Sequence, residues 1–246
     1  MREPQFAYRL DLEYDGTDFF GWQIQPNQRT VQGELLAAAQ RLFPHPPIQI
    51  VGASRTDRGV HARHQVAVLR TSQPRPPGEI QSALNALTGD DLWIHRVTPV
   101  PLEFHPRYQA RAKRYQYRVV RGHSPLRRRY AWEFPLPLNV PLLQRLASQL
   151  LGEHDFKLLS TDPRENTRIA LLESHWRERD DELVYTVVAP RFLYKMVRIL
   201  VGTMVLAAAG RLPADTLARA LQGQRVRIAV APPQGLVLDR IFFEMP

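Results

Sequence analysis

Residues 6–14, FAYRLDLEY, alternate apolar and polar side chains with a period of two. This alternation predicts a strand that buries one face and exposes the other, as is common in antiparallel sheets. Asp15 and Gly16 end the pattern with a turn signal. Farther along, Thr30 is a suitable helix-capping residue, and apolar residues recur at helical spacing from Val31 to Leu42. A half-exposed strand followed by an amphipathic helix is therefore predicted at the start of the chain.

The same two periodicities continue through the rest of the sequence. They predict further strands at 48–51, 65–71, 92–97, 111–120, 168–177, 183–189 and in the tail LVLDRIFFEM, and helices at 79–87, 139–151, 192–209 and 213–221. Strands and helices mixed in this way predict an α+β fold. We expect two ferredoxin-like-type halves, residues 1–104 and 105–246, whose mainly antiparallel sheets join around a central basic cleft.

The composition narrows the possible functions. The chain has 246 residues, a formal net charge of +9 and no cysteine, which excludes disulfides, thiolate metal sites and cysteine nucleophiles. The positive charge favours a polyanionic partner. Only three of the 33 basic residues are lysine; arginine suits nucleic acid, although codon bias would produce the same excess.

The location of the protein is also constrained by its hydropathy. The N-terminal residues lack the continuous apolar core of a signal peptide. The most apolar run, residues 199–210, is too short to span a bilayer, and Lys195 and Arg198 precede it. We predict a cytoplasmic protein without a membrane segment.

One loop concentrates unusual chemistry. Residues 51–62, VGASRTDRGVHA, place a single carboxylate, Asp57, between Arg55 and Arg58. The simplest interpretation is structural, because Asp57 and Gly59 are turn formers and the spacing from Ser54 resembles a helix capping box. The functional interpretation is a catalytic acid within a basic surface.

Outside this loop, the sequence offers few candidates for a metal site, a phosphate-binding loop or a nucleic-acid-binding segment. The eight histidines are scattered, and His61 and His64 have no evident third ligand, so a metal site is not expected. No phosphate-binding glycine loop is present. Residues 107–129 contain nine basic residues interleaved with tyrosines. Unpaired nucleic acid bases stack on such rings while the basic residues bind phosphates. Of Tyr115 and Tyr117, at least one is expected in the core. Arg198 lies among apolar residues, so its stem should be partly buried.

Several of these motifs together resemble one family, the bacterial tRNA pseudouridine synthase A (TruA) family. The resemblance runs in order through LDLEYDGTDFFGWQIQPNQRTVQGEL, GASRTDRGVHA, RAKRYQYRV, LLGEHDF, RFLYKMVRILVGTM and APPQGLVL, and so covers nearly the whole chain. The loop around Asp57 is its most specific part. Family members usually carry Gly and Ala where this chain has Ser54 and Arg58, and this difference leaves the acid, Arg55 and Gly59 in place.

The resemblance implies an enzyme that isomerises uridines 38, 39 and 40 of the tRNA anticodon arm. It also implies a homodimer that needs no cofactor or metal. Asp57 matches the catalytic aspartate, Tyr115 the tyrosine that packs against the target base, and Arg198 the arginine that pairs with the aspartate. Arg55 matches an arginine that helps to handle the displaced nucleotide.

The chemistry of the reaction agrees with these roles. The N1–C1′ bond breaks, the uracil turns and C5 forms the new bond, without redox chemistry or energy input. One carboxylate can act at C1′ as nucleophile or at C2′ as base, and both mechanisms remain open. The nucleotide must leave its stack to reach the acid. Two other functions also remain: a related synthase that modifies other uridines, and a non-catalytic RNA-binding protein.

Overall fold

The structure is a computed structural model of the chain, and it describes residues 3–161 and 166–246. The chain forms two compact units, Met1–Arg111 with Leu238–Pro246, and Ala112–Val237. This division differs from the boundary expected after residue 104. Helix α3 (Pro106–Gln109) and the end of the chain group with the first unit, where the amide of Arg111 donates to the carbonyl of Phe242 at 2.8 Å.

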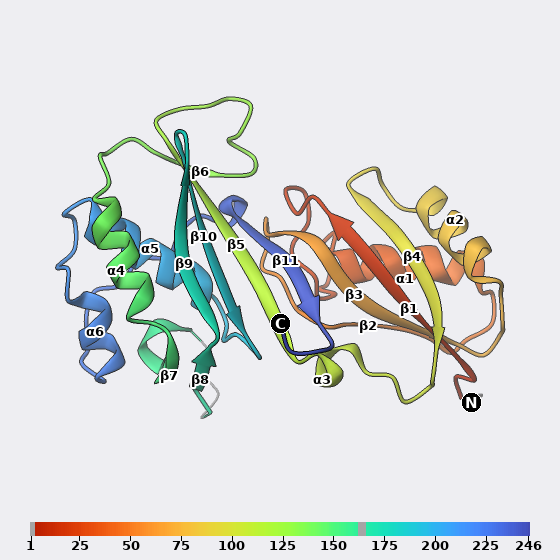
Figure 1. Cartoon of the computed structure of the whole chain (residues 1–246). Coiled ribbons are helices and arrows are strands. Elements are labelled where there is room, and N and C mark those ends of the chain that lie inside the picture. The colour runs from red at the N-terminus through yellow and green to blue at the C-terminus, as the bar shows by residue number, and fades with distance from the viewer. Residues whose placement is uncertain (1–2, 162–165) are drawn as a thin grey trace. The chain divides into compact units, whose positions relative to one another are not determined.

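The first unit contains a sheet whose strand order is β4-β1-β3, with β2 also paired to β3. All of these pairs are antiparallel, and Leu10 of the central strand β1 lies opposite Ala67 of β3 and Val97 of β4. The last strand, β11, lies beside β3. The elements, coloured from red to yellow in Figure 1, are β1 (Phe6–Tyr14), α1 (Val31–Leu42), β2 (Ile48–Gly52), β3 (His61–Thr71), α2 (Pro77–Leu87) and β4 (Leu92–Val100), with β11 (Leu236–Phe242) in blue.

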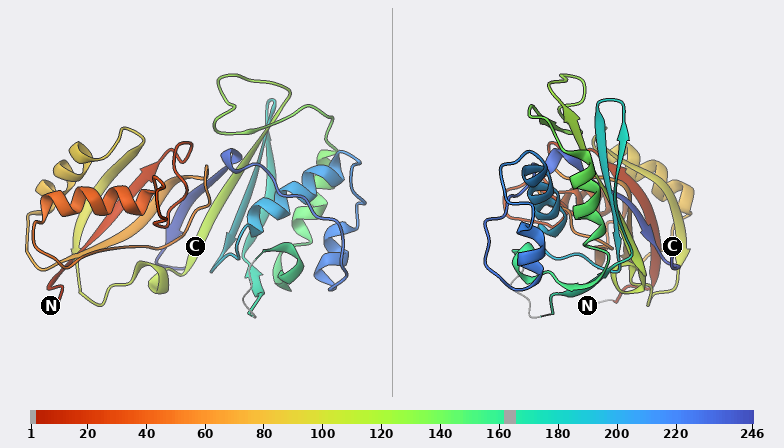
Figure 2. Two further views of the ribbon diagram at one scale, coloured as in Figure 1. Left: turned by 180° about the vertical axis from the view of Figure 1, so that it is seen from behind. Right: turned by 60° about the vertical axis from the view of Figure 1, so that its left-hand side comes forward.

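The core of this unit follows the predicted alternation. Along β1 the side chains of Tyr8, Leu10, Leu12 and Tyr14 are buried. Helices α1 and α2 cover one face of the sheet, as the view from behind in Figure 2 shows. The cap of α1 is Thr30, whose hydroxyl accepts a hydrogen bond from the Gly33 amide at 3.2 Å. The strand predicted at 6–14 and the helix predicted from Val31 to Leu42 are confirmed.

The second unit contains the antiparallel strands β5-β10-β9, with β6 parallel to β5. Helices α4 and α5 lie on one side of these strands (Figures 1 and 2), and Gln144 of α4 donates to the carbonyl of Trp176 in β9 at 2.6 Å. The elements are β5 (Ala112–Arg121), β6 (Trp132–Phe134), α4 (Val140–Ser148), β7 (Gly152–Asp155), η1 (Lys157–Leu159), β8 (Arg168–Leu171), β9 (Glu173–Arg179), β10 (Glu182–Ala189), α5 (Met196–Ala208), α6 (Thr216–Leu221) and η2 (Pro233–Gly235).

Among the elements of the second unit that differ from prediction, two have a clear cause in the backbone. The helix expected from residue 192 begins only at Met196, because Lys195 before it adopts a left-handed conformation with φ 59°. The strand expected at 168–177 is two strands: β8 pairs with β7, whereas β9 pairs with β10. Both differences come from backbone geometry that hydrophobic periodicity does not encode.

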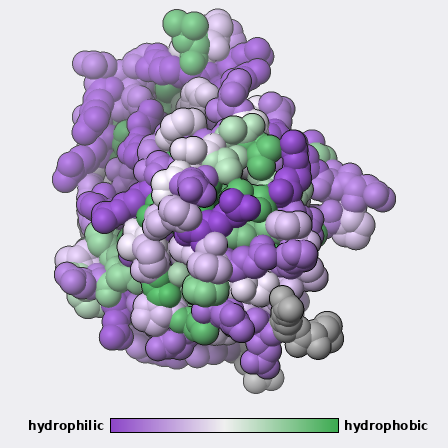
Figure 3. Space-filling view, turned by 90° about the vertical axis from the view of Figure 1, so that its right-hand side faces the viewer, coloured by the Kyte–Doolittle hydropathy of each residue, from purple (hydrophilic) through white to green (hydrophobic). Residues whose placement is uncertain are grey.

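The surface shown in Figure 3 is mainly hydrophilic, with hydrophobic residues in smaller patches. Among the described helices, none is both long and apolar enough to cross a bilayer.

Candidate active site

The connection between β2 and β3 carries Asp57. The carbonyl of Asp57 accepts a hydrogen bond from the Val60 amide at 3.1 Å and closes a tight turn. Gly59 has a φ of 76°, a conformation that favours glycine. The turn predicted from Asp57 to Gly59 is therefore confirmed. The helix capping box suggested at Ser54 is wrong, because the chain passes from this turn directly into strand β3.

Two glycines of the segment after β1 pack against the backbone of this turn. A Cβ atom on Gly16 would lie 2.1 Å from the carbonyl oxygen of Val60, and one on Gly21 would lie 2.5 Å from that of Thr56. Both distances are far inside van der Waals contact. A side chain at either position would therefore displace the backbone that carries Asp57.

Hydrogen bonds join the same two segments. The amide of Trp22 donates to the carbonyl of Thr56 at 3.1 Å, and the amide of Gly59 donates to the carbonyl of Phe19 at 3.2 Å. The Thr56 hydroxyl also shares a buried hydrogen bond of 2.9 Å with the hydroxyl of Tyr14. Asp57 thus lies between two residues whose backbones are bonded to residues 19–22.

A buried amide supports the start of the loop. Gln65 is fully buried; its Nε2 donates to the Ser54 carbonyl at 2.7 Å, and its Oε1 accepts from the Ser54 amide at 3.2 Å. Because both backbone groups of Ser54 are satisfied by one side chain, the loop can be buried here without the cost of unpaired polar groups.

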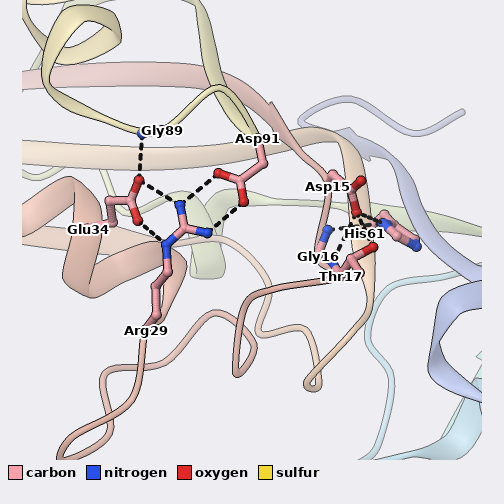
Figure 4. Close-up of polar contacts among 8 residues, drawn as sticks. All are labelled: Asp15, Gly16, Thr17, Arg29, Glu34, His61, Gly89 and Asp91. Atoms are coloured by element: carbon pink, nitrogen blue, oxygen red, sulfur yellow. Dashed lines mark hydrogen bonds and ion pairs between the residues drawn. The ribbon is translucent and has the colours of Figure 1, made fainter. Parts of the chain in front are cut away.

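An ionic network fixes the far end of residues 15–30 (Figure 4). The Arg29 guanidinium donates to Glu34 at 2.7 and 3.0 Å and to Asp91 at 2.6 and 2.7 Å. Glu34 in turn accepts from the amide of Gly89 at 2.7 Å. The hydrogen bonds that Arg29 donates to Asp91 and Glu34 raise the pKa of Arg29. The network therefore ties the N-terminal turn of α1 to the turn before β4.

The other group in Figure 4 surrounds His61. Its Nδ1 accepts a hydrogen bond from the Gly16 amide at 3.0 Å and lies 3.0 Å from the carboxylate of Asp15. The same carboxylate accepts from the amide and hydroxyl of Thr17. His61 therefore helps to hold the segment that packs on the Asp57 turn.

The charged side chains of the turn differ in exposure. Asp57 is half-buried, whereas Arg55 and Arg58 are exposed. The Arg58 guanidinium lies over the ring of Phe20, 4.1 Å from its centre. The backbone of the turn is thus rigidly held, while two cations on either side of Asp57 face solvent.

In the second unit, Tyr115 and Tyr117 project from the same face of β5. Tyr115 is 6% exposed and packs edge-on against Phe192 with ring centres 5.1 Å apart. Tyr117 is fully buried, and its hydroxyl donates to the carbonyl of Pro232 at 2.8 Å. Burial raises the pKa of Tyr117, and the charge of Arg198 acts in the opposite direction. The prediction that at least one of the two tyrosines is a core residue is confirmed.

Arg198 lies in the first turn of α5 and is half-buried, as predicted from its apolar neighbours. Its Nε donates to the carbonyl of Ala231 at 2.9 Å, and the Ala231 amide donates to the Arg198 carbonyl at 2.9 Å. A Cβ on Gly202, one turn later, would lie 2.5 Å from the carbonyl oxygen of Ala229. The segment before η2 therefore packs directly on α5 and orients the Arg198 side chain.

The predicted site residues thus fall in both units: Asp57 and Arg55 in the first, Tyr115 and Arg198 in the second. Sequence reasoning missed the residues that support the loop, namely Gly16, Gly21, Tyr14, Gln65 and Arg29. The two glycines in DGTDFFGW were the available signal, because glycines close together outside a predicted helix indicate backbone contacts.

Comparison with known proteins identifies the family. The family model described as tRNA pseudouridine synthase matches residues 12–109 and 146–244. The chain belongs to this family. Asp57, Arg55 and Arg198 lie within the matched segments, whereas Tyr115 lies in the stretch between them.

Individual relatives match over almost their full length. Proteins named tRNA pseudouridine synthase A from Halalkalibacterium halodurans, Chlorobium limicola and a Thermoanaerobacter species are 40%, 38% and 36% identical; each match covers 94% of this chain and 90%, 96% and 97% of the respective relative. Among solved structures, a Cbf5-Nop10-Gar1 complex matches weakly, with 9% identity over 98% of this chain and 58% of that chain and a TM-score of 0.38. A similarity this low does not bear on the fold.

Proposed function

We propose that this tRNA pseudouridine synthase isomerises uridines 38, 39 and 40 in the anticodon arm of tRNA, with Asp57 as the catalytic aspartate. The observation that carries the proposal is the Asp57 turn: a carboxylate on a turn whose backbone is held by hydrogen bonds, between two exposed arginines, in a chain of this family. A protein that only bound RNA would gain nothing from a carboxylate fixed at that position, because it repels phosphate.

A tritium-release assay tests this function. A tRNA transcript labelled at C5 of uridine should lose tritium to water, since isomerisation replaces that hydrogen when C5 bonds to C1′. A matched transcript with cytidine at positions 38–40 should lose none. Release from the cytidine transcript would indicate a synthase for other uridines, and binding without any release would indicate a non-catalytic RNA-binding protein.

The residues around Asp57 are suited to the steps of this reaction. The carboxylate acts on the sugar of a nucleotide that has left its stack, either at C1′ or at C2′. Arg55, exposed two residues before the acid, is positioned to hold the displaced nucleotide. The rigid backbone of the turn means that the acid needs little reorganisation before reaction.

Tyr115 is proposed to hold the detached uracil through its ring. Tyr115→Phe should retain most activity, whereas Tyr115→Leu should reduce turnover by roughly 10- to 100-fold, the equivalent of one lost base–ring contact. Because Tyr115 also packs on Phe192, the unfolding free energy of both variants is measured beside the rate. Wild-type rates in the leucine variant would mean that the ring does not contact the substrate.

We further propose that the guanidinium of Arg198 pairs with the Asp57 carboxylate in the active enzyme. The chain has no cysteine. A double variant that combines Asp57→Cys with Arg198→Cys therefore contains only two thiols. A bifunctional reagent that spans about 5 Å should link them within one chain, whereas Asp57→Cys with Arg145→Cys, exposed on α4, should remain unlinked. Absence of the link while both thiols react singly would contradict the pairing.

The proposal also covers the fold type, the oligomeric state and the cellular location. The order strand, helix, strand, strand, helix, strand in the first unit, with strand order β4-β1-β3 and β2 beyond β3, supports a ferredoxin-like arrangement. The family resemblance supports a homodimer, for which light scattering in solution is the direct measurement. A cytoplasmic location follows from the tRNA substrate and is tested by cell fractionation.

A further inference from the structure

Two consecutive phenylalanines beside the Asp57 turn each carry a guanidinium. The Arg29 guanidinium lies over the Phe19 ring and that of Arg58 over the Phe20 ring, each 4.1 Å from the ring centre. The two arginines therefore share one kind of ring contact. Their ionic surroundings are opposite, and this difference indicates different roles.

The guanidinium of Arg29 is already paired with carboxylates of the protein. Its guanidinium makes four hydrogen bonds to the two carboxylates of Glu34 and Asp91 (Figure 4). An additional anion would have to displace one of these carboxylates. The Arg29 carbonyl also accepts a hydrogen bond from the Phe20 amide at 2.8 Å, so this ionic network fixes the position of the Phe20 backbone.

Arg58 has the opposite environment. It is exposed, and among the residues that the structure describes no carboxylate lies within ion-pair distance of it. Its contact is the Phe20 ring, which covers one face of the planar guanidinium. The N–H groups at the edge of that plane, up to five in number, belong to an exposed residue and are accessible to a ligand. Ring contact also restricts the side chain, so less rotamer entropy is lost when a ligand binds.

The ligand that fits this environment is a phosphate. A guanidinium edge matches the geometry of two phosphate oxygens, and the chain carries a net charge of +9. Arg58 directly follows Asp57 in a turn whose backbone is fixed by the Phe19 carbonyl. A phosphate held at Arg58 would therefore belong to the nucleotide that Asp57 acts on, or to its neighbour in the strand.

We propose that Arg58, pre-positioned on Phe20, binds a phosphate of the RNA backbone next to the target uridine. The proposal rests on the proposed function, because it takes tRNA as the substrate. It assigns Arg58 to substrate binding and Arg29 to support of the loop.

The salt dependence of tRNA binding tests this assignment. Each phosphate contact contributes about 0.7 to 0.9 to the slope of log K against log salt concentration. Arg58→Ala should therefore make the slope less negative by about that amount and weaken binding several-fold at low salt. Arg58→Lys should keep the slope, and Phe20→Leu should keep the slope but weaken binding, because the guanidinium is no longer pre-positioned.

Arg41→Ala is the matched control, since Arg41 is an exposed arginine in the last turn of α1 and its loss removes the same charge. Its slope should equal that of the wild type. A wild-type slope in Arg58→Ala would overturn the proposal. If the affinity were weakened at the same time, the loss would indicate a base stacked on the guanidinium rather than a phosphate bound at its edge. Failure of the function itself would appear separately, as tRNA binding by the wild type without tritium release.

Discussion

Asp57→Asn should reduce tritium release from tRNA by on the order of 10⁴-fold, the loss typical of removing a reacting side chain. Asparagine is nearly isosteric with aspartate but is neither a nucleophile nor a base. The Asp57 carbonyl accepts a hydrogen bond that closes the turn, and asparagine keeps this backbone group, so the turn should persist. Because one negative charge is removed beside RNA, tRNA affinity should be unchanged or slightly higher.

Asp18→Asn is the control for the Asp57 substitution. Asp18 is an exposed acid in the segment that packs on the turn, and its replacement changes the net charge in the same way. Its rate should stay near that of the wild type. Substantial tritium release by Asp57→Asn would remove Asp57 from the reaction and leave the turn with a structural role alone.

Gly16→Ala should lower the free energy of unfolding by about 1–3 kcal/mol, the range for forcing an extra methyl group into a packed site. The added Cβ would lie 2.1 Å from the Val60 carbonyl oxygen and 2.5 Å from its carbon. These are backbone atoms, so the turn itself must move. We therefore expect a loss of activity in the molecules that remain folded as well as a lower midpoint in urea.

Gly78→Ala provides the comparison for that stability measurement. Gly78 lies in the first turn of α2, and a Cβ there would meet no atom within 4 Å. Alanine should therefore be neutral or should stabilise the helix by about 0.5–1 kcal/mol. Equal unfolding free energies for Gly16→Ala and the wild type would show that the turn can shift without cost, and would weaken the link between this glycine and the geometry of Asp57.

Features that depend on near neighbours along the chain could be predicted from the sequence. The alternation at 6–14 predicts β1, and Thr30 with the apolar residues after it predicts α1, because burial of one face repeats at the period of the element. The turn after Asp57 follows from the local preferences of Asp and Gly. The motifs were also sufficient to indicate the family, which the matched segments 12–109 and 146–244 establish.

The support of the Asp57 turn could not be predicted, because it depends on contacts between distant segments. Gly16 and Gly21 contact a loop about 40 residues later in the chain, and Gln65 satisfies both backbone groups of Ser54. The last strand returns to the first unit. The sequence does not distinguish a glycine in an open loop from a glycine that packs against a carbonyl group far away in the chain. Excluded volume and hydrogen-bond satisfaction act between segments that meet only in the folded chain, and for that reason local periodicity predicts the strands but not the contacts that hold the acid between them.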